Sequence, residues 1–304
     1  MNEIKLQTPV DPGRSAVEIS IKDTTVVLGS CFADNIGKKM EAFGFDVLVN
    51  PFGTLYNPVS VTEAVARLGS GEAFKAEECV RMGAGSDLVC SFSHNTSFAR
   101  DTQEDFLEYA NLSLGKSSQM WKKATKVIVT LGTAFCFRHI QSGRTVANCL
   151  KIDGREFIRY RLDVEGTVAL LERMMEENPA KEFIFTVSPI RHLKDGAHGN
   201  QLSKSTLLLA VDRICTEYPG RADYFPAYEI VLDELRDYRF YAEDLVHPSG
   251  QAVECLWSRF LDFCLPAGER EEILAREKIL KRSAHRPLHL RRLVEVRRDA
   301  SKWG

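Results

Sequence analysis

Two residues with nucleophilic side chains, Ser30 and Cys31, follow directly after a short apolar segment. The stretch TTVVLGSCFADNIGKKM at 24–40 passes from β-branched and apolar residues through Gly29 into a segment with helical spacing. This pattern predicts a buried strand that turns sharply into a helix. Because the N-terminus of a helix stabilises negative charge and lowers the pKa of a thiol, both side chains are candidate nucleophiles.

A candidate acid–base pair lies near the other end of the chain, where Asp244 and His247 stand three residues apart in EDLVHPSGQA. On a turn, a carboxylate at this spacing can accept a hydrogen bond from the imidazole and fix its tautomer, which leaves the second ring nitrogen to act as a base. The alternative is a helix-capping aspartate beside a surface histidine. Combined with a nucleophile at a strand-to-helix turn, the pair favours nucleophilic catalysis.

Three further segments carry candidate binding residues. The segment NPFGTLYNP at 50–58 contains Gly53, whose backbone N–H can approach a ligand closely because glycine has no Cβ. The segment TLGTAFCFRH at 130–139 places Thr133 at the end of an expected strand. The segment SPIRHLKDGAHGNQLSK at 188–204 is dense in basic residues, which suits an anionic substrate group or a lid. An ordinary hydrogen-bonded surface loop is the alternative there.

Three residues are predicted to bind substrate: Arg191, His192 and His94. For His94, in SFSHNTSF, a hydrogen-bonded histidine at a strand end is the alternative. His192 and His198 are six residues apart, with no cysteine or third histidine at ligand spacing. No metal site and no cofactor are therefore predicted.

The composition excludes several classes of function. Forty basic and forty-two acidic residues give a net charge of −2, so nucleic acid is not the expected partner. Eight cysteines are scattered without a C-x-x-C pair, which indicates reduced thiols rather than a disulfide scaffold. The sequence shows neither a signal peptide nor a run of 18 apolar residues, so we expect a cytoplasmic protein without a membrane span.

Strand-like and helix-like segments alternate along the chain. Short apolar runs lie at 24–29, 45–50, 87–92, 126–132 and 182–188. Helical spacing appears at 34–43, 60–68, 103–113 and 167–177, and again at 203–218 and 249–263, where serine stands at or near the N-cap. The alternation predicts an α/β fold with a parallel sheet covered on both faces, a three-layer α/β/α sandwich. Ligands bind such sheets at the carboxyl ends of the strands.

The composition changes after Pro266, so we divide the chain into a domain at 1–265 and a charged C-terminal helical extension at 266–304. The segment EREEILAREKILKR is expected to form an exposed helix that packs Ile273, Leu274 and Leu280 on the domain. A basic tail, SAHRPLHLRRLVEVRRDASKWG, follows it. An arm that binds nucleic acid or a protein partner is the alternative.

Several blocks of the sequence resemble the GSCFA family, which is grouped with the SGNH (GDSL-like) hydrolases. The resemblance covers roughly residues 15–265 and rests on GSCFADNIG, NPFGTLYNP, VTLGTAF, NCLK, SPIRHLKDGAHGNQLSKSTLLLA and YFPAYEIVLDELRDYRFYAEDLVHPS. It implies a flavodoxin-like (SGNH hydrolase-like) sheet. The implied chemistry is acyl transfer to water or to another acceptor, with an acylated small molecule or glycan as substrate.

The SGNH motifs align with this chain only in part. The final D-x-x-H block matches Asp244 to His247, the glycine of the second block matches Gly53, and the G-D-S block falls on Gly29 to Cys31. That alignment puts Cys31 on the nucleophile position. The G-x-N block falls on 132–134, so the asparagine of the oxyanion hole is replaced by alanine.

The resemblance therefore leaves two candidate oxyanion donors beside Gly53, namely Thr133 and Asn148. Asn148 belongs to ANCLK, where Leu150 stands in place of the histidine that the family usually carries. Whatever that histidine does in the family, this chain lacks it.

We expect an acyl hydrolase that forms a covalent acyl-enzyme, with His247 as general base and Asp244 as its orienting carboxylate. Cys31 is favoured as nucleophile because a thiolate is the stronger nucleophile near neutral pH. Ser30 stays open, since a one-residue shift in the turn would present its hydroxyl instead. Two other functions remain: an acyltransferase to a sugar or amine, and a binding protein without turnover. The oligomeric state is not predicted.

Overall fold

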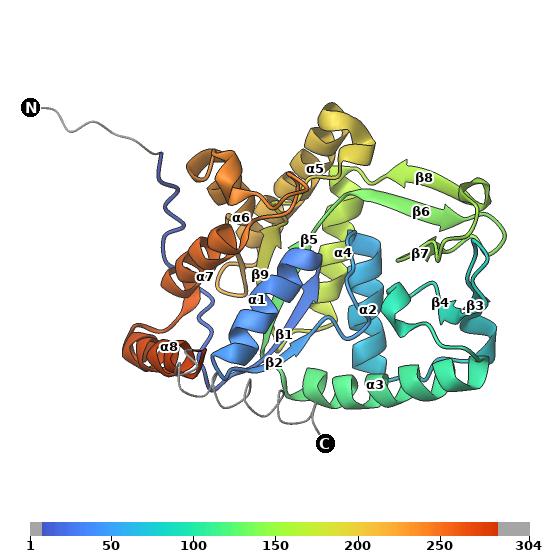
Figure 1. Ribbon diagram of the computed structural model, residues 1–304, viewed down its shortest axis with the longest axis horizontal. Coiled ribbons are helices and arrows are strands. Elements are labelled where there is room, and N and C mark those ends of the chain that lie inside the picture. Colours follow the sequence, from blue (N-terminus) through green and yellow to red (C-terminus); the bar gives the residue numbers. More distant parts are fainter. Residues whose placement is uncertain (1–7, 285–304) are drawn as a thin grey trace, which may run out of the picture.

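The central element of the protein is a five-stranded parallel sheet. The computed structural model describes residues 8–284, and its sheet has the strand order β10-β9-β5-β1-β2 with every neighbouring pair parallel. Numbered along the chain, these five strands follow the flavodoxin-like order 2-1-3-4-5, in which the order reverses between β1 and β5. The prediction of a three-layer α/β/α sandwich is confirmed (Figure 1).

The elements have the following bounds. The central strands are β1 (Thr24–Gly29), β2 (Asp46–Val49), β5 (Lys126–Leu131), β9 (Glu182–Val187) and β10 (Ala222–Tyr224). The other strands are β3 (Cys79–Arg81), β4 (Val89–Ser91), β6 (Phe135–His139), β7 (Thr145–Val146) and β8 (Phe157–Arg161). The helices are α1 (Cys31–Ala42), α2 (Pro58–Ser70), α3 (Gln103–Lys123), α4 (Val164–Glu176), α5 (Gly196–Glu217), α6 (Ala227–Glu229), α7 (Gly250–Cys264) and α8 (Arg270–Ala284).

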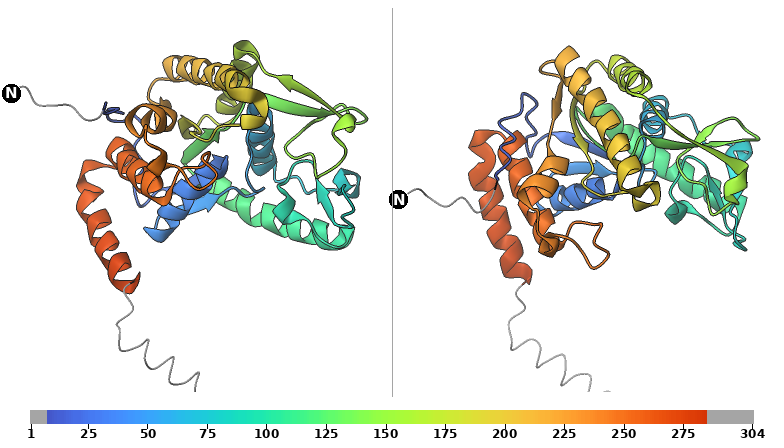
Figure 2. Two further views of the ribbon diagram at one scale, coloured as in Figure 1. Left: turned by 45° about the horizontal axis from the view of Figure 1, so that its top comes forward. Right: turned by 90° about the horizontal axis from the view of Figure 1, so that it is seen from above.

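Both faces of the sheet are buried, which explains why its strands are apolar without alternation. In β1, Val26 and Leu28 pack with the helices α2 to α5 on one face. Val27 points to the other face and packs with α1 and α7. Figures 1 and 2 show these two helical layers, with α8 and the β6–β8 sheet at opposite ends of the molecule.

Residues 87–92 do not join the central sheet, contrary to the sequence-based prediction. Their strand β4 pairs antiparallel with β3 in a separate two-stranded sheet. A short apolar run does not specify its partner, and the nearest strand in the sequence can be reached without a crossover connection. The three-stranded antiparallel sheet β7-β6-β8 was not predicted either.

The two later helices differ in how well their starts were predicted. Ser249 is the N-cap of α7, and its Oγ accepts a hydrogen bond from the backbone N–H of Ala252 at 3.3 Å. Helix α5 begins at Gly196, two turns before the expected serine, so Ser203 lies buried inside the helix. Propensity placed the helix correctly and missed its first turns.

Helix α8 packs on the domain through only part of its apolar face. Ile273 is buried and Leu280 is partly buried against the cluster of α1 and α7, while Leu274 is 44% exposed. Arg276 donates from Nη1 to the carbonyl of Phe43 at 2.6 Å. The basic tail from 285 onward lies outside the described residues.

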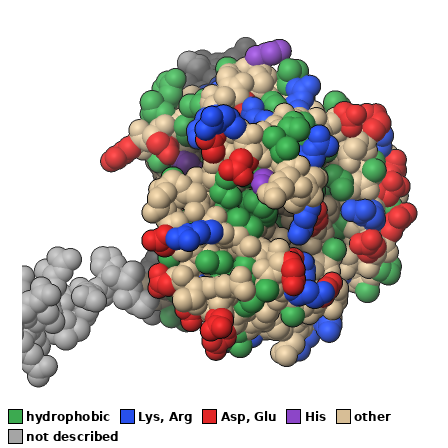
Figure 3. Space-filling model, turned by 90° about the vertical axis from the view of Figure 1, so that its right-hand side faces the viewer, with side chains coloured by type: hydrophobic (Ala, Val, Ile, Leu, Met, Phe, Trp, Pro, Cys, Tyr) green, Lys and Arg blue, Asp and Glu red, His purple; other side chains and the backbone are tan. Residues whose placement is uncertain are grey.

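The surface and the helices of residues 8–284 carry two further observations. Figure 3 shows Lys and Arg side chains interspersed with Asp and Glu over one face of the molecule. No helix in the described part of the chain combines the length and the apolar character that crossing a membrane requires.

Candidate active site

The carboxyl ends of β1, β5 and β9 border a cleft with a volume of about 910 Å³. This position includes the point where the strand order reverses, the usual place for a ligand in such sheets. Six residues predicted from the sequence line it: Ser30, Cys31, Thr133, Arg191, His192 and His247.

The turn between β1 and α1 is fixed by close packing and by one asparagine. Gly29 has φ +134°, and a Cβ there would lie 2.1 Å from the carbonyl oxygen of Thr130, so only glycine fits. Asn50 accepts a hydrogen bond from the N–H of Gly29 at 2.8 Å and donates to the carboxylate of Asp34 at 2.5 Å. The start of α1 is therefore held against both neighbouring strands.

Ser30 and Cys31 have different roles in this turn. Ser30 is only 1% exposed and is the N-cap of α1, where its Oγ accepts from the N–H of Phe32 at 3.3 Å. Cys31 is the first residue of α1 and is half-buried, with its Sγ 3.4 Å from the hydroxyl of Tyr56. The N–H of Cys31 has no acceptor among the described residues. The thiol therefore stands at the positive end of the helix dipole.

Asp244 and His247 form the predicted pair. The imidazole Nδ1 lies 2.5 Å from Asp244 Oδ2, while Asp244 Oδ1 accepts from the backbone N–H groups of Val246 and His247. These backbone hydrogen bonds, followed by the one to the imidazole, lower the pKa of Asp244 to about 2. The carboxylate stays ionised near neutral pH and directs Nδ1 as a donor, which leaves Nε2 of His247 as the basic nitrogen on the cleft.

Two of the predicted oxyanion donors do not reach the cleft. The N–H of Gly53 donates to the carbonyl of Asn50 at 2.8 Å, and the positive φ of +78° brings Gly53 against Asn95 rather than toward a ligand. The side chain of Asn148 accepts from the N–H of Leu150 at 2.8 Å, and neither residue lines the cleft. Both assignments are corrected: these residues shape turns.

Thr133 lines the cleft, but its N–H and its hydroxyl both have partners within the protein. Its N–H donates to the carbonyl of Tyr56 at 2.9 Å. Its hydroxyl lies 3.0 Å from Ser203 Oγ and accepts from the N–H of Phe135. Its part in the site is to hold the floor of the cleft in place.

The donor that sequence reasoning missed is Asn57. It lines the cleft and is the N-cap of α2, where its Oδ1 accepts from the N–H and the hydroxyl of Ser60 at 2.9 and 3.1 Å. Its Nδ2 donates to no described residue, so one half of the amide caps the helix and the other half is available to a ligand. The sequence indicates only its capping role, because Asn followed by Pro58 is a helix-start signature.

The predicted substrate-binding residues separate into two groups. Arg191 is exposed on the cleft and forms no ion pair with a described carboxylate. His192 also lines the cleft, where burial, followed by the charges of Lys204, Arg159 and His247, lowers its pKa to about 4. The imidazole of His192 is therefore neutral near pH 7.

His94 lies outside the cleft, which corrects its assignment as a substrate-binding residue. The side chain is fully buried, with its ring against Phe52 and Phe74 and its Nδ1 2.7 Å from Ser91 Oγ. Burial lowers the pKa of His94 to about 3. The sequence-based alternative, a histidine within the fold, describes it better.

The cleft has an apolar wall and a buried lysine beneath its floor. Its wall includes Phe135, Phe137, Val146, Ala147, Ile190 and Leu193. Beneath the floor, the fully buried Lys204 donates from Nζ to the carbonyls of Gly132 and Ser188 at 2.6 and 2.7 Å. Burial lowers the pKa of Lys204 to about 7. Asp195 is the only carboxylate among the described residues that line the cleft, and it is paired with Arg159.

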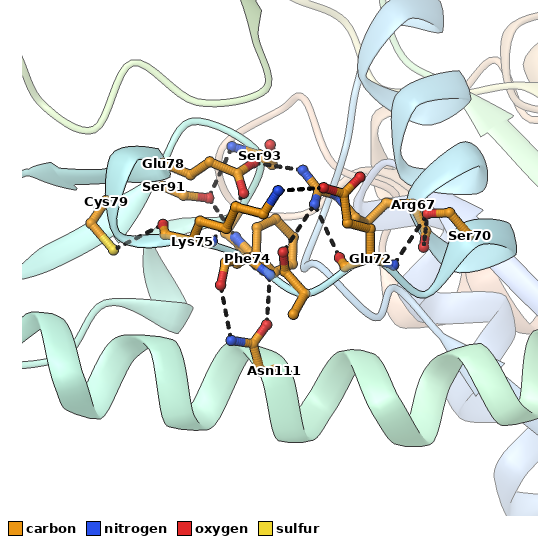
Figure 4. A network of polar contacts seen from close by, with 12 residues as sticks. Arg67, Ser70, Glu72, Phe74, Lys75, Glu78, Cys79, Ser91, Ser93 and Asn111 are labelled. Carbon is orange, nitrogen blue, oxygen red and sulfur yellow. Dashed lines mark hydrogen bonds and ion pairs between the residues drawn. The ribbon is translucent and has the colours of Figure 1, made fainter.

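A second hollow, of about 390 Å³, lies between α2 and the segment around Phe74. The polar network beside it is satisfied internally, as Figure 4 shows: Arg67 pairs with Glu78 at 2.5 Å and donates to the carbonyl of Glu72 at 3.0 Å. The guanidinium also lies 4.4 Å from the ring centroid of Phe74. These contacts hold α2 against the neighbouring loop, so Arg67 serves the fold at this hollow.

Within residues 8–284, no group of three His, Cys, Asp or Glu side chains is placed to hold a metal ion. The family model of the GSCFA family matches residues 24–260 of the chain, a span that runs from β1 into α7 and includes every residue of the cleft described above. No curated protein matches the chain.

Proposed function

Because the chain belongs to the GSCFA family, we propose from its cleft that it is an SGNH-like acyl hydrolase, with Cys31 as the residue that forms the acyl-enzyme. One observation carries the proposal. A half-buried thiol at the N-terminus of α1 shares a cleft with His247, whose Nδ1 is fixed by Asp244 at 2.5 Å. The flavodoxin-like strand order and the D-x-x-H spacing support the SGNH assignment.

In the proposed reaction His247 acts as a base and then as an acid in each half. His247 Nε2 takes the proton of the Cys31 thiol, and the thiolate attacks the acyl carbonyl carbon. The resulting oxyanion accepts hydrogen bonds from the N–H of Cys31 and from Asn57 Nδ2. His247 then returns its proton to the leaving oxygen, which departs as an alcohol. In the second half, His247 takes a proton from a water, whose oxygen attacks the thioester carbonyl. The bond from carbon to the Cys31 sulfur then breaks, the acid leaves, and His247 returns its proton to the sulfur.

The lining of the cleft supports an acylated substrate that also carries an anionic group. The aromatic and aliphatic wall around Phe135 and Phe137 suits an apolar acyl chain. Arg191 lines the cleft and has no carboxylate partner among the described residues, so its positive charge favours an anion. A phosphate, sulfate or carboxylate on the acceptor side of the ester would meet this requirement.

The test is a panel of p-nitrophenyl acyl esters of increasing chain length, read by nitrophenolate release and by intact mass. Turnover supports the hydrolase. An acyl adduct that persists until a sugar or amine is added supports the alternative of an acyltransferase. If neither nitrophenolate release nor an acyl adduct is observed, the remaining function is that of a binding protein without turnover.

The matched variants are Cys31→Ala and Ser30→Ala. Loss of the nucleophile should lower turnover by about 10⁴ or more, as in other triads. Ser30→Ala should keep the adduct, because Ser30 serves as the N-cap of α1. An adduct on Ser30 in the wild-type protein would move the nucleophile to the serine.

A further inference from the structure

A chain of polar contacts runs from Asn95 through Thr54 and Tyr56 to the sulfur of Cys31. Asn95 Nδ2 lies 2.9 Å from Thr54 Oγ1, which is 3.3 Å from the Tyr56 hydroxyl, which in turn is 3.4 Å from Cys31 Sγ. None of the three supporting residues was singled out from the sequence. All of them belong to the two loops that follow β2 and β4.

The direction of this chain is set at its far end. Asn95 Oδ1 accepts a hydrogen bond from the N–H of Ser97 at 3.0 Å, so its amide nitrogen is the group that faces Thr54 and can only donate. Thr54 Oγ1 accepts that hydrogen bond and has its own proton left for the oxygen of Tyr56. The Tyr56 hydroxyl, once it accepts from Thr54, has its proton left for the sulfur.

The backbone holds the Tyr56 ring in place for this contact. The carbonyl of Tyr56 accepts from the N–H groups of both Gly132 and Thr133, at 2.7 and 2.9 Å. On the cleft side, the ring stands edge-on to His192 with 5.9 Å between centroids. Tyr56 is therefore fixed to the end of β5 while its hydroxyl faces the start of α1.

The position of Asn95 depends on Gly53. A Cβ on Gly53 would lie 2.3 Å from Asn95 Cβ, and the N–H of Asn95 donates to the carbonyl of Phe52 at 2.9 Å. The glycine that the sequence suggested as a ligand contact thus lets the two loops approach closely enough for Asn95 to reach Thr54.

We propose that Tyr56 donates its hydroxyl hydrogen bond to Cys31 Sγ and thereby stabilises the thiolate, with Thr54 and Asn95 as the positioning residues that fix its direction. This inference deepens the proposed function and rests on it for the use of the thiolate. A hydrogen bond to an ionised group is stronger than one to its neutral form, so the donor shifts the thiol toward ionisation.

Protonation of Tyr56 is secure over the relevant pH range. Burial, followed by the hydrogen bond to Cys31, raises the pKa of Tyr56 to about 12. The hydroxyl therefore still carries its proton when a cysteine ionises, since an ordinary thiol has a pKa near 8.5.

A second cysteine–tyrosine–threonine group in the same chain provides the matched control. Tyr160 lies 2.8 Å from Thr145 Oγ1 and interacts with Cys136, which is fully buried and whose pKa burial raises to about 12. There the tyrosine accompanies an inert thiol, because desolvation outweighs the hydrogen bond. Among the cysteines of residues 8–284, only Cys31 combines the donor with partial exposure and a helix N-terminus.

The experiment is peptide-resolved alkylation by iodoacetamide as a function of pH, in the wild-type protein and in Tyr56→Phe, Thr54→Val and Tyr160→Phe. Tyr56→Phe should raise the apparent pKa of Cys31 by about one unit, the size of one hydrogen bond to a charged group. Alkylation below that pKa should slow about tenfold. Thr54→Val should shift the pKa in the same direction by less, and Tyr160→Phe should leave Cys31 unchanged.

The outcomes separate this inference from the proposed function. If Cys31 in the wild-type protein reacts no faster than Cys215 or Cys255, then Cys31 is not the proposed nucleophile and both fail. If Cys31 reacts fast but titrates identically in the wild-type protein, Tyr56→Phe and Thr54→Val, only the role of Tyr56 is overturned. Because Thr54→Val leaves the whole ring of Tyr56 in place, it decides the question should Tyr56→Phe fold poorly.

Discussion

Replacing Asn57 tests whether its free amide hydrogens act on the reaction, because its two functions can be separated. Asn57→Ser keeps an N-cap acceptor for the N–H of Ser60, now held at 2.9 Å, but removes Nδ2 from the cleft. Loss of one oxyanion donor lowers turnover by about 10² to 10³, equivalent to about 2.7–4 kcal/mol. Asn57→Ala should lose the same turnover and, in addition, about 1 kcal/mol of the free energy of unfolding as the cap disappears.

The assay combines kcat and kcat/KM on the best p-nitrophenyl ester with urea unfolding of each variant. Asn148→Ser is the matched control, since Asn148 also uses its Oδ1 for a local turn but lies outside the cleft. It should keep wild-type turnover. The reasoning is refuted if Asn57→Ser retains kcat within about threefold of wild type, far from the loss expected for an oxyanion donor, or if Asn148→Ser loses as much as Asn57→Ser.

Three further outcomes are expected. Arg191→Glu should raise KM at least about tenfold for an ester with a sulfonated leaving group and leave KM for the neutral ester unchanged. Only the binding of the sulfonated ester depends on the charge of Arg191. Equal effects on the two KM values would contradict an anion site. The free energy of unfolding should fall as pH drops from about 6.5 toward 4, because burial lowers the pKa of His192 to about 4 and that of His94 to about 3. In this pH range the two side chains bind protons only in the unfolded protein. In urea titrations at several pH values each histidine contributes up to about 1.4 kcal/mol per pH unit, and His94→Phe should flatten the slope. Gly53→Ala should lower the urea midpoint and slow Cys31 alkylation. Gly53 has φ +78°, and its new Cβ would lie 2.3 Å from Asn95 Cβ, which displaces the loop beside the cleft. An unchanged urea midpoint would contradict this expectation.

The sequence predicted the parts of the fold that local pattern decides. The apolar runs of β1, β5 and β9 are buried on both faces, and that burial is what makes them continuous in the sequence. The strand-to-helix turn at Ser30 and the pairing of Asp244 with His247 were predictable because each is local, with partners at most three residues apart.

What escaped prediction depends on contacts between segments that are far apart in the chain. Gly53 was interpreted as a ligand contact because a missing Cβ permits the close approach of a ligand or of another segment, and only the position of Asn95 decides between them. His94 was assigned to the substrate because the sequence does not show which residues surround it. Its aromatic neighbours Phe52 and Phe74 come from separate segments of the chain. Tyr56 and Asn57 gave no catalytic signal in the sequence, because only the folded structure brings Tyr56 to the sulfur of Cys31 and both residues to the cleft.

Much of the wall of the cleft comes from one segment that stands outside the central sheet. Residues 135–161 form the β7-β6-β8 sheet and supply Phe135, Phe137 and Arg159 to the cleft. The chain leaves and re-enters the framework at almost the same place, where the N–H of Leu162 donates to the carbonyl of Ala134 at 2.9 Å. Lengthening, shortening or exchanging that segment would remodel this part of the cleft surface and leave the turn of Cys31 untouched. The lining of the cleft can thus change independently of the thiol and of the Asp244–His247 pair.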